Sequence, residues 1–230
     1  MGTRLRLFLI FLGGLLVLMT WTYPAWRPEP SIVVRDDGFP GLDIDLQDEF
    51  LALPADTQRS YLRMYQQNSM RATAMVRAHL TPPGDPIPEL SEAPNLSTAT
   101  LERSGQFGPL ILPETDERDE PDFNSLYAQS AGQVAIYQYP DGTRLLRIED
   151  LDIINGPDLW VAISPQPLPI IGTIAELGAT YIDIAALQSN TGSHNYFSVP
   201  DATNVSLNDY ATVVIYDRTY QVIFAIAPIQ

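Results

Sequence analysis

Apolar positions form a continuous run near the start of the chain, from Leu7 to Met19, shortly after two arginines. A run of this kind predicts a helix that enters a membrane, and the preceding positive charges predict a cytoplasmic N-terminus. The bulky residues Trp21, Tyr23 and Trp26 follow where a signal peptide would carry small residues for cleavage. We therefore expect residues 1–26 to be a membrane anchor or uncleaved signal helix, with a cleaved signal peptide and a secreted product as the alternative.

Two further segments precede the C-terminal half of the chain. Residues 27–55 are rich in Pro, Gly and acidic side chains, which predicts an exposed acidic spacer. The acidic positions there do not follow the twelve-residue calcium-loop spacing, so we favour the spacer over a calcium site. Residues 56–80 carry apolar side chains at steps of three and four, which predicts one amphipathic helix. His79 lies beside this apolar stripe, and we expect it to pack rather than to bind a metal.

The pattern changes again after a stretch rich in Pro. Residues 81–128 end in acidic side chains, and we expect a stiff, extended linker. From residue 129 onward, short β-branched and aromatic runs alternate with turn pairs such as Asp141-Gly142, which is typical of an antiparallel β-sandwich or barrel. Eight runs are strand-like: 134–139, 144–148, 150–154, 159–163, 180–187, 195–199, 212–216 and 220–227. The last two are almost continuously apolar, which predicts an interior position in the sheet, buried on both faces.

The predicted fold class is therefore mainly β. Residues 129–230 form an antiparallel β-sandwich or barrel of about eight strands, preceded by an N-terminal transmembrane helix, a soluble helix and a Pro-rich linker.

Composition removes several classes of function. The chain has 28 acidic and 13 basic residues and a formal net charge of −15, so it repels phosphate backbones, and we expect no nucleic-acid partner. Every basic residue is Arg, which excludes lysine-based covalent chemistry. The absence of Cys excludes disulfides, iron–sulfur clusters and a thiolate nucleophile. No Gly-x-Ser-x-Gly elbow occurs and no spacing singles out a carboxylate pair, so we expect no catalysis by the chain itself.

The ordered motifs of the C-terminal domain resemble those of the DM-thirteen family, also called the electron-transfer DM domain, over about residues 129–230. The matching motifs are Gly132 to Tyr139, Asp141-Gly142, Leu145 to Asp150, Asn155 to Val161, Leu187, Asn190, Gly192, Asn195-Tyr196, Pro200, Val213 to Tyr216 and Phe224 to Pro228. The resemblance implies a β-sandwich of extracytoplasmic or cell-surface proteins. It also implies a redox role through a Cys in the penultimate strand, and that position corresponds here to Asp217.

Six residues of this domain are candidates either for a ligand site or for a structural turn: Asp158, Asn155, Arg147, Asp150, His194 and Asp217. Asp158 follows a Pro-fixed turn, where a carboxylate commonly accepts backbone N–H groups. Arg147 and Asp150 lie on a polar strand face that favours salt bridges. The domain has no Met and a single His, His194, and therefore lacks the usual pair of haem ligands and the usual copper ligands. We predict no cofactor, no metal and no catalytic residue.

These observations lead to two hypotheses of different classes. The first is a single-pass membrane protein whose β domain, outside the cytoplasm, binds a protein or a small ligand without catalysis. The second is an electron-transfer accessory that uses a noncovalent redox cofactor or one supplied by a partner.

Overall fold

The computed structural model of the chain describes residues 38–81, 88–108, 130–167, 174–197, 199–200 and 205–230. Among these residues, no helix is long and apolar enough to span a membrane. The predicted anchor, residues 1–26, lies outside the described residues, as does the first part of the predicted acidic spacer.

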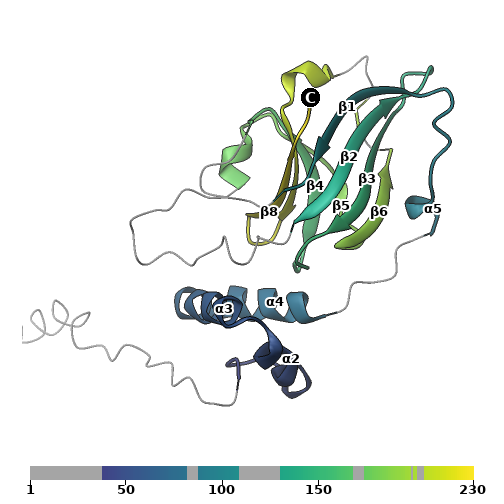
Figure 1. Cartoon of the computed structure of the whole chain (residues 1–230). Coiled ribbons are helices and arrows are strands. Elements are labelled where there is room, and N and C mark those ends of the chain that lie inside the picture. The colour runs from purple at the N-terminus through teal and green to yellow at the C-terminus, as the bar shows by residue number, and fades with distance from the viewer. Residues whose placement is uncertain (1–37, 82–87, 109–129, 168–173, 198, 201–204) are drawn as a thin grey trace, which may run out of the picture. The chain divides into compact units, whose positions relative to one another are not determined.

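The described residues from 100 to 228 contain eight strands in two four-stranded antiparallel sheets (Figure 1). One sheet has the order β1-β2-β3-β6 and the other has the order β5-β4-β7-β8. The strands are β1 (Thr100–Gln106), β2 (Ala131–Gln138), β3 (Arg144–Asp152), β4 (Leu159–Ser164), β5 (Ile182–Ala186), β6 (Thr191–Tyr196), β7 (Thr212–Asp217) and β8 (Val222–Pro228). This arrangement confirms the mainly β prediction and is consistent with a sandwich.

Successive side chains of each strand point to opposite faces of the β1-β2-β3-β6 sheet, so one face is buried and the other is solvated. In β2, Val134 and Ile136 are buried, whereas Gln133 is exposed on the opposite face. The register pairs Val134 with Ile148 and Ile136 with Leu146, so the apolar side chains of neighbouring strands share the buried face. The residues between them, on the other face, form a polar surface.

The last two strands have the burial that the sequence predicts, but one of them lies elsewhere in the sheet. All six residues of β7 are buried, and in β8 only Pro228 is exposed. We expected both strands in the interior of a sheet, yet β8 is the terminal strand of its sheet. Its end is covered because the C-terminal segment reaches β1, where the backbone groups of Ser104 and Gln230 exchange hydrogen bonds of 3.0 and 3.2 Å.

The turn at Asp141-Gly142 is confirmed. Gly142 has a φ of 89°, which the absence of a Cβ makes accessible, and the backbone N–H of Tyr139 donates to the carbonyl of Thr143 at 2.9 Å. The two short strands predicted at 144–148 and 150–154 are wrong as separate elements, because both belong to β3. The break that the sequence suggests is a bulge at Asp150, which has a φ of 50°.

The predicted linker, residues 81–128, is wrong for part of its length. It contains the short helix α5 (Pro88–Ser91) and the whole of β1, which pairs with β2 along its full length. The sandwich therefore begins about thirty residues before the domain boundary that we predicted from the motifs, as the bounds of β1 show.

The segment before the linker is helical. A 3-10 turn, η1 (Ile44–Leu46), and α2 (Gln47–Ala52) occupy part of the predicted spacer, and α2 buries Phe50. The single predicted helix, residues 56–80, is two helices, α3 (Ala55–Gln67) and α4 (Ser69–Leu80). Asn68 separates them because its backbone is extended and its side chain accepts the N–H of Arg71, which caps α4.

His79 packs within this helical segment, as the apolar stripe predicts. Its Nδ1 lies 2.7 Å from the hydroxyl of Tyr61. Burial lowers the pKa of His79.

Candidate functional site

The six predicted residues do not form one site. Asp158 and Asp217 are linked to each other beside the β7–β8 turn, and Asn155 lies in the loop before β4. Arg147 lies on the outer face of the β1-β2-β3-β6 sheet, and His194 lies on its inner face. Asp150 is exposed at the bulge of β3, where its backbone N–H is 3.4 Å from the hydroxyl of Ser193.

Asp217 is the last residue of β7, the penultimate strand, and is fully buried. One carboxylate oxygen accepts the backbone N–H of Asp158 at 2.9 Å, and the other accepts that of Tyr220 at 2.7 Å. Asp217 therefore joins the start of β4 to the turn that leads into β8. Burial, as the largest influence, raises the pKa of Asp217, while these backbone donors oppose the rise.

Asp158 has the structural role that a turn Asp suggests. Its two carboxylate oxygens accept hydrogen bonds from the indole of Trp160 at 3.0 Å and from the hydroxyl of Thr219 at 2.9 Å. The guanidinium of Arg218 lies over the indole ring, 4.2 Å from its centroid. The carboxylate of Asp158 is thus already engaged at the β7–β8 turn.

The Asp217 position does not suit a thiolate-bound redox group. A carboxylate stands where the family resemblance places a redox-active Cys, and both of its oxygens hold backbone donors. The residues present at this position hold the turn and supply no thiolate ligand.

Asn155 and Asp158 line a pocket that we call the loop pocket. It is formed by the loop 155–159 and the segment 186–190, together with Thr81, and has a volume of about 380 Å³. The side-chain amide of Asn155 donates to the carbonyl of Ala78 at 2.9 Å. Two buried amide oxygens of the wall, those of Gln188 and Asn190, accept no hydrogen bond from any described residue.

His194 lies in the interior of the sandwich. It is opposite Ile148 in the register, it is 1% exposed, and its Nε2 is 3.1 Å from the carbonyl of Thr191. The ring of Tyr196, two residues further along β6, has its centroid 6.3 Å from that of His194. Burial lowers the pKa of His194 and raises the pKa of Tyr196. An imidazole in these surroundings is a core residue without a carboxylate partner among the described side chains.

Arg147 lies in the middle of the outer face of the β1-β2-β3-β6 sheet. Its Nε forms an ion pair with Glu149 at 2.7 Å, and its Nη1 donates to the side-chain oxygen of Asn195 at 2.8 Å. Both Arg147 and Asn195 also donate to the carbonyl of Glu92, which follows α5. The predicted polar strand face is confirmed, and α5 adds a partner that the sequence did not indicate.

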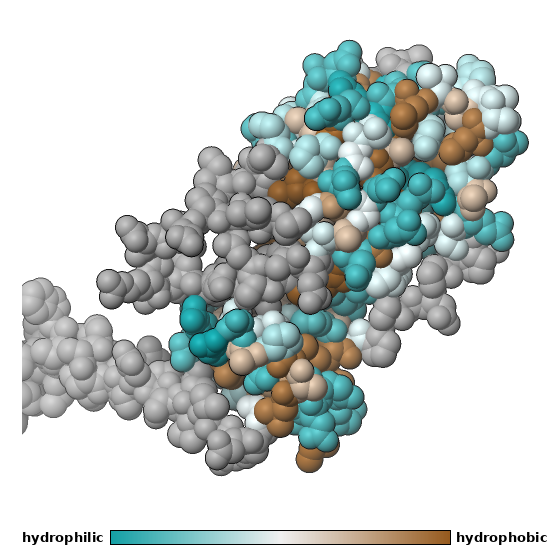
Figure 2. All heavy atoms as spheres, viewed as in Figure 1, coloured by the Kyte–Doolittle hydropathy of each residue, from teal (hydrophilic) through white to brown (hydrophobic). Residues whose placement is uncertain are grey.

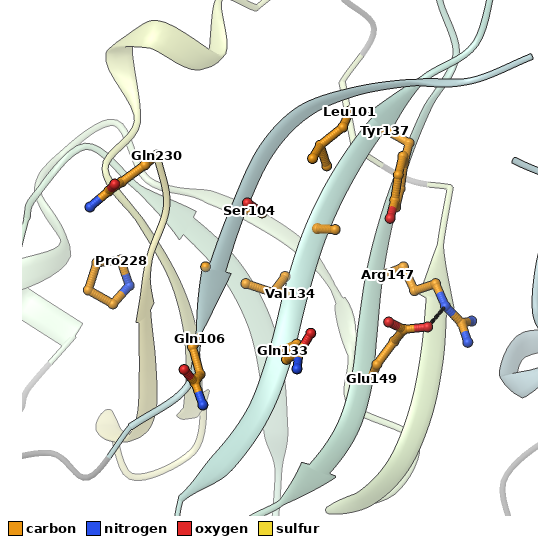
Figure 3. Close-up of a pocket in the computed structure, with 12 residues that line it drawn as sticks. Leu101, Ser104, Gln106, Gln133, Val134, Tyr137, Arg147, Glu149, Pro228 and Gln230 are labelled. Atoms are coloured by element: carbon orange, nitrogen blue, oxygen red, sulfur yellow. Dashed lines mark hydrogen bonds and ion pairs between the residues drawn. The ribbon is translucent and has the colours of Figure 1, made fainter.

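A second pocket, which we call the sheet groove, lies on the same face (Figure 3) and has a volume of about 570 Å³. Its lining residues are Leu101, Ser104, Gly105, Gln106, Gln133, Val134, Ala135, Tyr137, Arg147, Glu149, Pro228 and Gln230. The face that carries it is turned toward the reader in Figures 1 and 2, where hydrophilic residues cover most of it and hydrophobic ones are scattered.

The cross-strand register orders the sheet groove into three rows. Gln106, Gln133 and Glu149 are direct neighbours across β1, β2 and β3 and form the first row. Ser104, Ala135 and Arg147 form the second row, in which two small side chains leave the floor low. Leu101 and Tyr137 form the third, apolar row.

Sequence reasoning missed the sheet groove. Among the described residues, the side chains of Gln106 and Gln133 make no hydrogen bond, so both amides are available to a ligand. Gln133 alternates with buried residues in β2. This alternation was the available signal, because it predicts a solvated face. The groove itself depends on β1, which lies in the segment that the sequence assigned to a linker.

Among the described residues, no three His, Cys, Asp or Glu side chains lie close enough together to hold a metal ion. Comparisons with curated proteins and with solved structures gave no match. A family model does match: the description is electron transfer DM13, and it covers residues 122–229. The resemblance found in the motifs is therefore confirmed, because residues 122–229 match the electron transfer DM13 family model.

Proposed function

We propose that the chain is a single-pass membrane protein that displays its DM13 domain outside the cytoplasm and binds a ligand or a protein partner there, without catalysis of its own. The observation that carries the binding role is the sheet groove, because the side chains of Gln106 and Gln133 have hydrogen-bonding capacity that no described residue uses. Open grooves with a few converging polar groups are the usual form of a binding site.

The proposed location is supported by the N-terminal sequence. A run of apolar residues follows two arginines and is followed by Trp and Tyr, which favour membrane interfaces. The formal net charge of −15 gives the chain no affinity for nucleic acid, which suits a domain displayed outside the cytoplasm.

Site-specific photo-crosslinking in intact cells tests the binding role. A benzophenone amino acid replaces Gln133 in the first row of the groove, or Gln138 on the same strand as a matched control. Gln133 is exposed on the outer face, whereas Gln138 is half-buried at the end of β2 and does not line the groove.

We expect illumination to attach a discrete species of any chemical class at position 133 and not at position 138. Labelling that is equal at the two positions, or absent from both, would contradict the binding role.

A second candidate function follows from the family match. Because the family is described as electron transfer, the DM13 domain could serve as an accessory that holds a noncovalent redox cofactor or receives one from a partner. Asp217 argues against a ligand role for the penultimate strand, because both of its oxygens are committed to the turn. The accessory role predicts a stoichiometric chromophore or redox metal in the purified full chain.

A further inference from the structure

We propose that the sheet groove binds a neutral saccharide chain. This inference rests on the proposed binding function and names the class of ligand. Its basis is the way in which the three rows of the groove match the two kinds of surface on a sugar ring.

The first row supplies hydrogen bonds. Gln106 and Gln133 are directly opposite in the register, so their side chains lie within about 5 Å of each other at the Cβ atoms. Each amide carries one acceptor and two donors, so neighbouring amides can donate to and accept from adjacent hydroxyl groups. Vicinal hydroxyls, which are both donors and acceptors, are the ligand groups that use this combination fully.

The third row supplies an apolar wall. Tyr137 and Leu101 are paired across β1 and β2, and Leu101 is 52% exposed. The C–H face of a sugar ring is apolar and can pack on an aromatic ring, which carries a negative face. Gln133 and Tyr137 are four residues apart along β2, so the amide row and the apolar row are separated by about 13 Å. This span is longer than one sugar ring, so the two rows contact successive rings of a saccharide chain.

The middle row leaves space for the saccharide chain between the two walls. Ser104 and Ala135 are small and directly paired, so the floor between the two walls is low. Figure 3 shows this order, with Leu101 and Tyr137 at one side, Ser104 between, and Gln106 and Gln133 at the other side. A saccharide chain that contacts both walls therefore runs along the strands, from the apolar row to the amide row.

Charge favours a neutral saccharide over an acidic one. The two charged side chains of the groove, Arg147 and Glu149, form an ion pair of 2.7 Å and largely cancel each other. The chain as a whole has a formal net charge of −15, so an acidic polysaccharide meets long-range repulsion.

Isothermal titration of the full chain in lipid nanodiscs tests the proposal. The probes are cellohexaose and laminarihexaose as neutral chains, with oligogalacturonate as an acidic chain. We expect at least one neutral probe to bind and oligogalacturonate to bind more weakly or not at all.

Variants locate the binding in the groove. Gln133→Ala and Tyr137→Ala should each weaken the affinity for the neutral probe by about tenfold, because each removes a wall of the groove. Tyr137→Phe keeps the ring and should bind nearly as well as the unchanged protein. Gln138→Ala, outside the groove on the same strand, should leave the affinity unchanged. Circular dichroism of each variant confirms that it is folded.

Three results would overturn the proposal. These are no binding of either neutral probe, stronger binding of oligogalacturonate, or a neutral-probe affinity that Tyr137→Ala and Gln133→Ala leave unchanged. If the groove instead crosslinks a protein in cells, the saccharide inference fails while the binding function stands. If the groove crosslinks nothing and binds neither probe, both fail.

Discussion

Asp217 and His194 are two titratable side chains inside a domain whose interior is otherwise mainly apolar. Asp217 is fully buried and holds two backbone N–H groups, and His194 is 1% exposed on the inner face of β6. Both pKa shifts come mainly from burial, which disfavours the charged form. The two residues therefore couple the stability of the domain to pH in opposite directions.

Replacing Asp217 by Ala should destabilise the domain by about 2 kcal/mol or more, because two buried backbone donors lose their acceptor. Urea unfolding followed by tryptophan fluorescence measures this free energy. The matched control is Asp209→Ala, which changes an exposed Asp in the 3-10 turn Leu207–Asp209 before β7 and should cost little. An equal effect of the two substitutions would show that Asp217 does not hold the turn.

The raised pKa of Asp217 also sets the sign of a pH effect. The folded protein binds a proton at higher pH than the unfolded chain, so this residue's contribution to stability grows as pH falls through the raised value. It is complete below the ordinary pKa of an unfolded Asp. We expect the free energy of unfolding of the wild type, relative to Asp217→Asn, to rise on acidification. If the difference in unfolding free energy between wild type and Asp217→Asn were the same at pH 7 and pH 4, the raised pKa of the buried Asp217 carboxyl would be contradicted.

His194 has the opposite behaviour, because burial lowers its pKa. Below the ordinary pKa of an unfolded His, the unfolded chain binds a proton that the folded domain does not, so stability falls as pH drops. His194→Gln keeps a donor for the carbonyl of Thr191 and cannot titrate. Between pH 7.5 and pH 5.5, the free energy of unfolding of His194→Gln should decrease less than that of the wild type. His79 is present in both proteins and contributes equally to their pH dependence.

Local chemistry at several residues could be predicted from the sequence. The turn role of Asp158 and the salt-bridged strand face around Arg147 follow from turn statistics and from alternation, and both are confirmed. The partners across the fold could not be predicted, because they depend on tertiary register. Examples are the carbonyl of Glu92 for Arg147 and the N–H of Tyr220 for Asp217.

At the scale of elements, β1 was missed because its sequence carries little strand propensity. The segment TLERSGQ has one β-branched residue and a Gly, and it follows a stretch rich in Pro. Its strand state comes from its neighbours: it pairs with β2 along its length and meets the C-terminal segment through Ser104 and Gln230. The sheet groove needs β1 for all three of its rows, so the site was missed with the strand.

Gly105→Ala tests the junction of β1 with the C-terminal segment. An added Cβ would lie 2.1 Å from the carbonyl oxygen of Pro228, so the two segments would have to separate. We expect a loss of about 1–3 kcal/mol, typical of overpacking. Gly108→Ala is the matched control, because a Cβ there meets nothing within 4 Å. Equal thermal midpoints for the two variants would contradict this junction.

The break between α3 and α4 gives a second test at this scale. The Asn68 side chain caps α4 through the N–H of Arg71 at 3.0 Å. Asn68→Ala should cost about 1 kcal/mol in the free energy of unfolding, the usual value for a lost N-cap. Gln66→Ala is the control, because Gln66 is an exposed residue of α3. No loss at Asn68 would mean that the two helices form without this cap.

At the scale of the whole molecule, strand alternation and the turn pairs predicted a β domain of the right class but without its first strand, and the family match agrees with that class. The helical segment before it was predicted from its apolar period, although the interruption at Asn68 was not. Function was harder to predict, because a DM13 domain that carries Asp at position 217 retains the fold while lacking the thiol that the resemblance implies.

We propose that this DM13 domain binds a ligand and does not itself carry electrons. The most direct measurement is the ultraviolet–visible spectrum of the full chain, purified from its membrane, together with elemental analysis for metals. We expect a folded protein with the absorption of Tyr and Trp alone and no stoichiometric redox metal. A stoichiometric chromophore or redox metal that survives purification would contradict it and establish the electron-transfer accessory role instead.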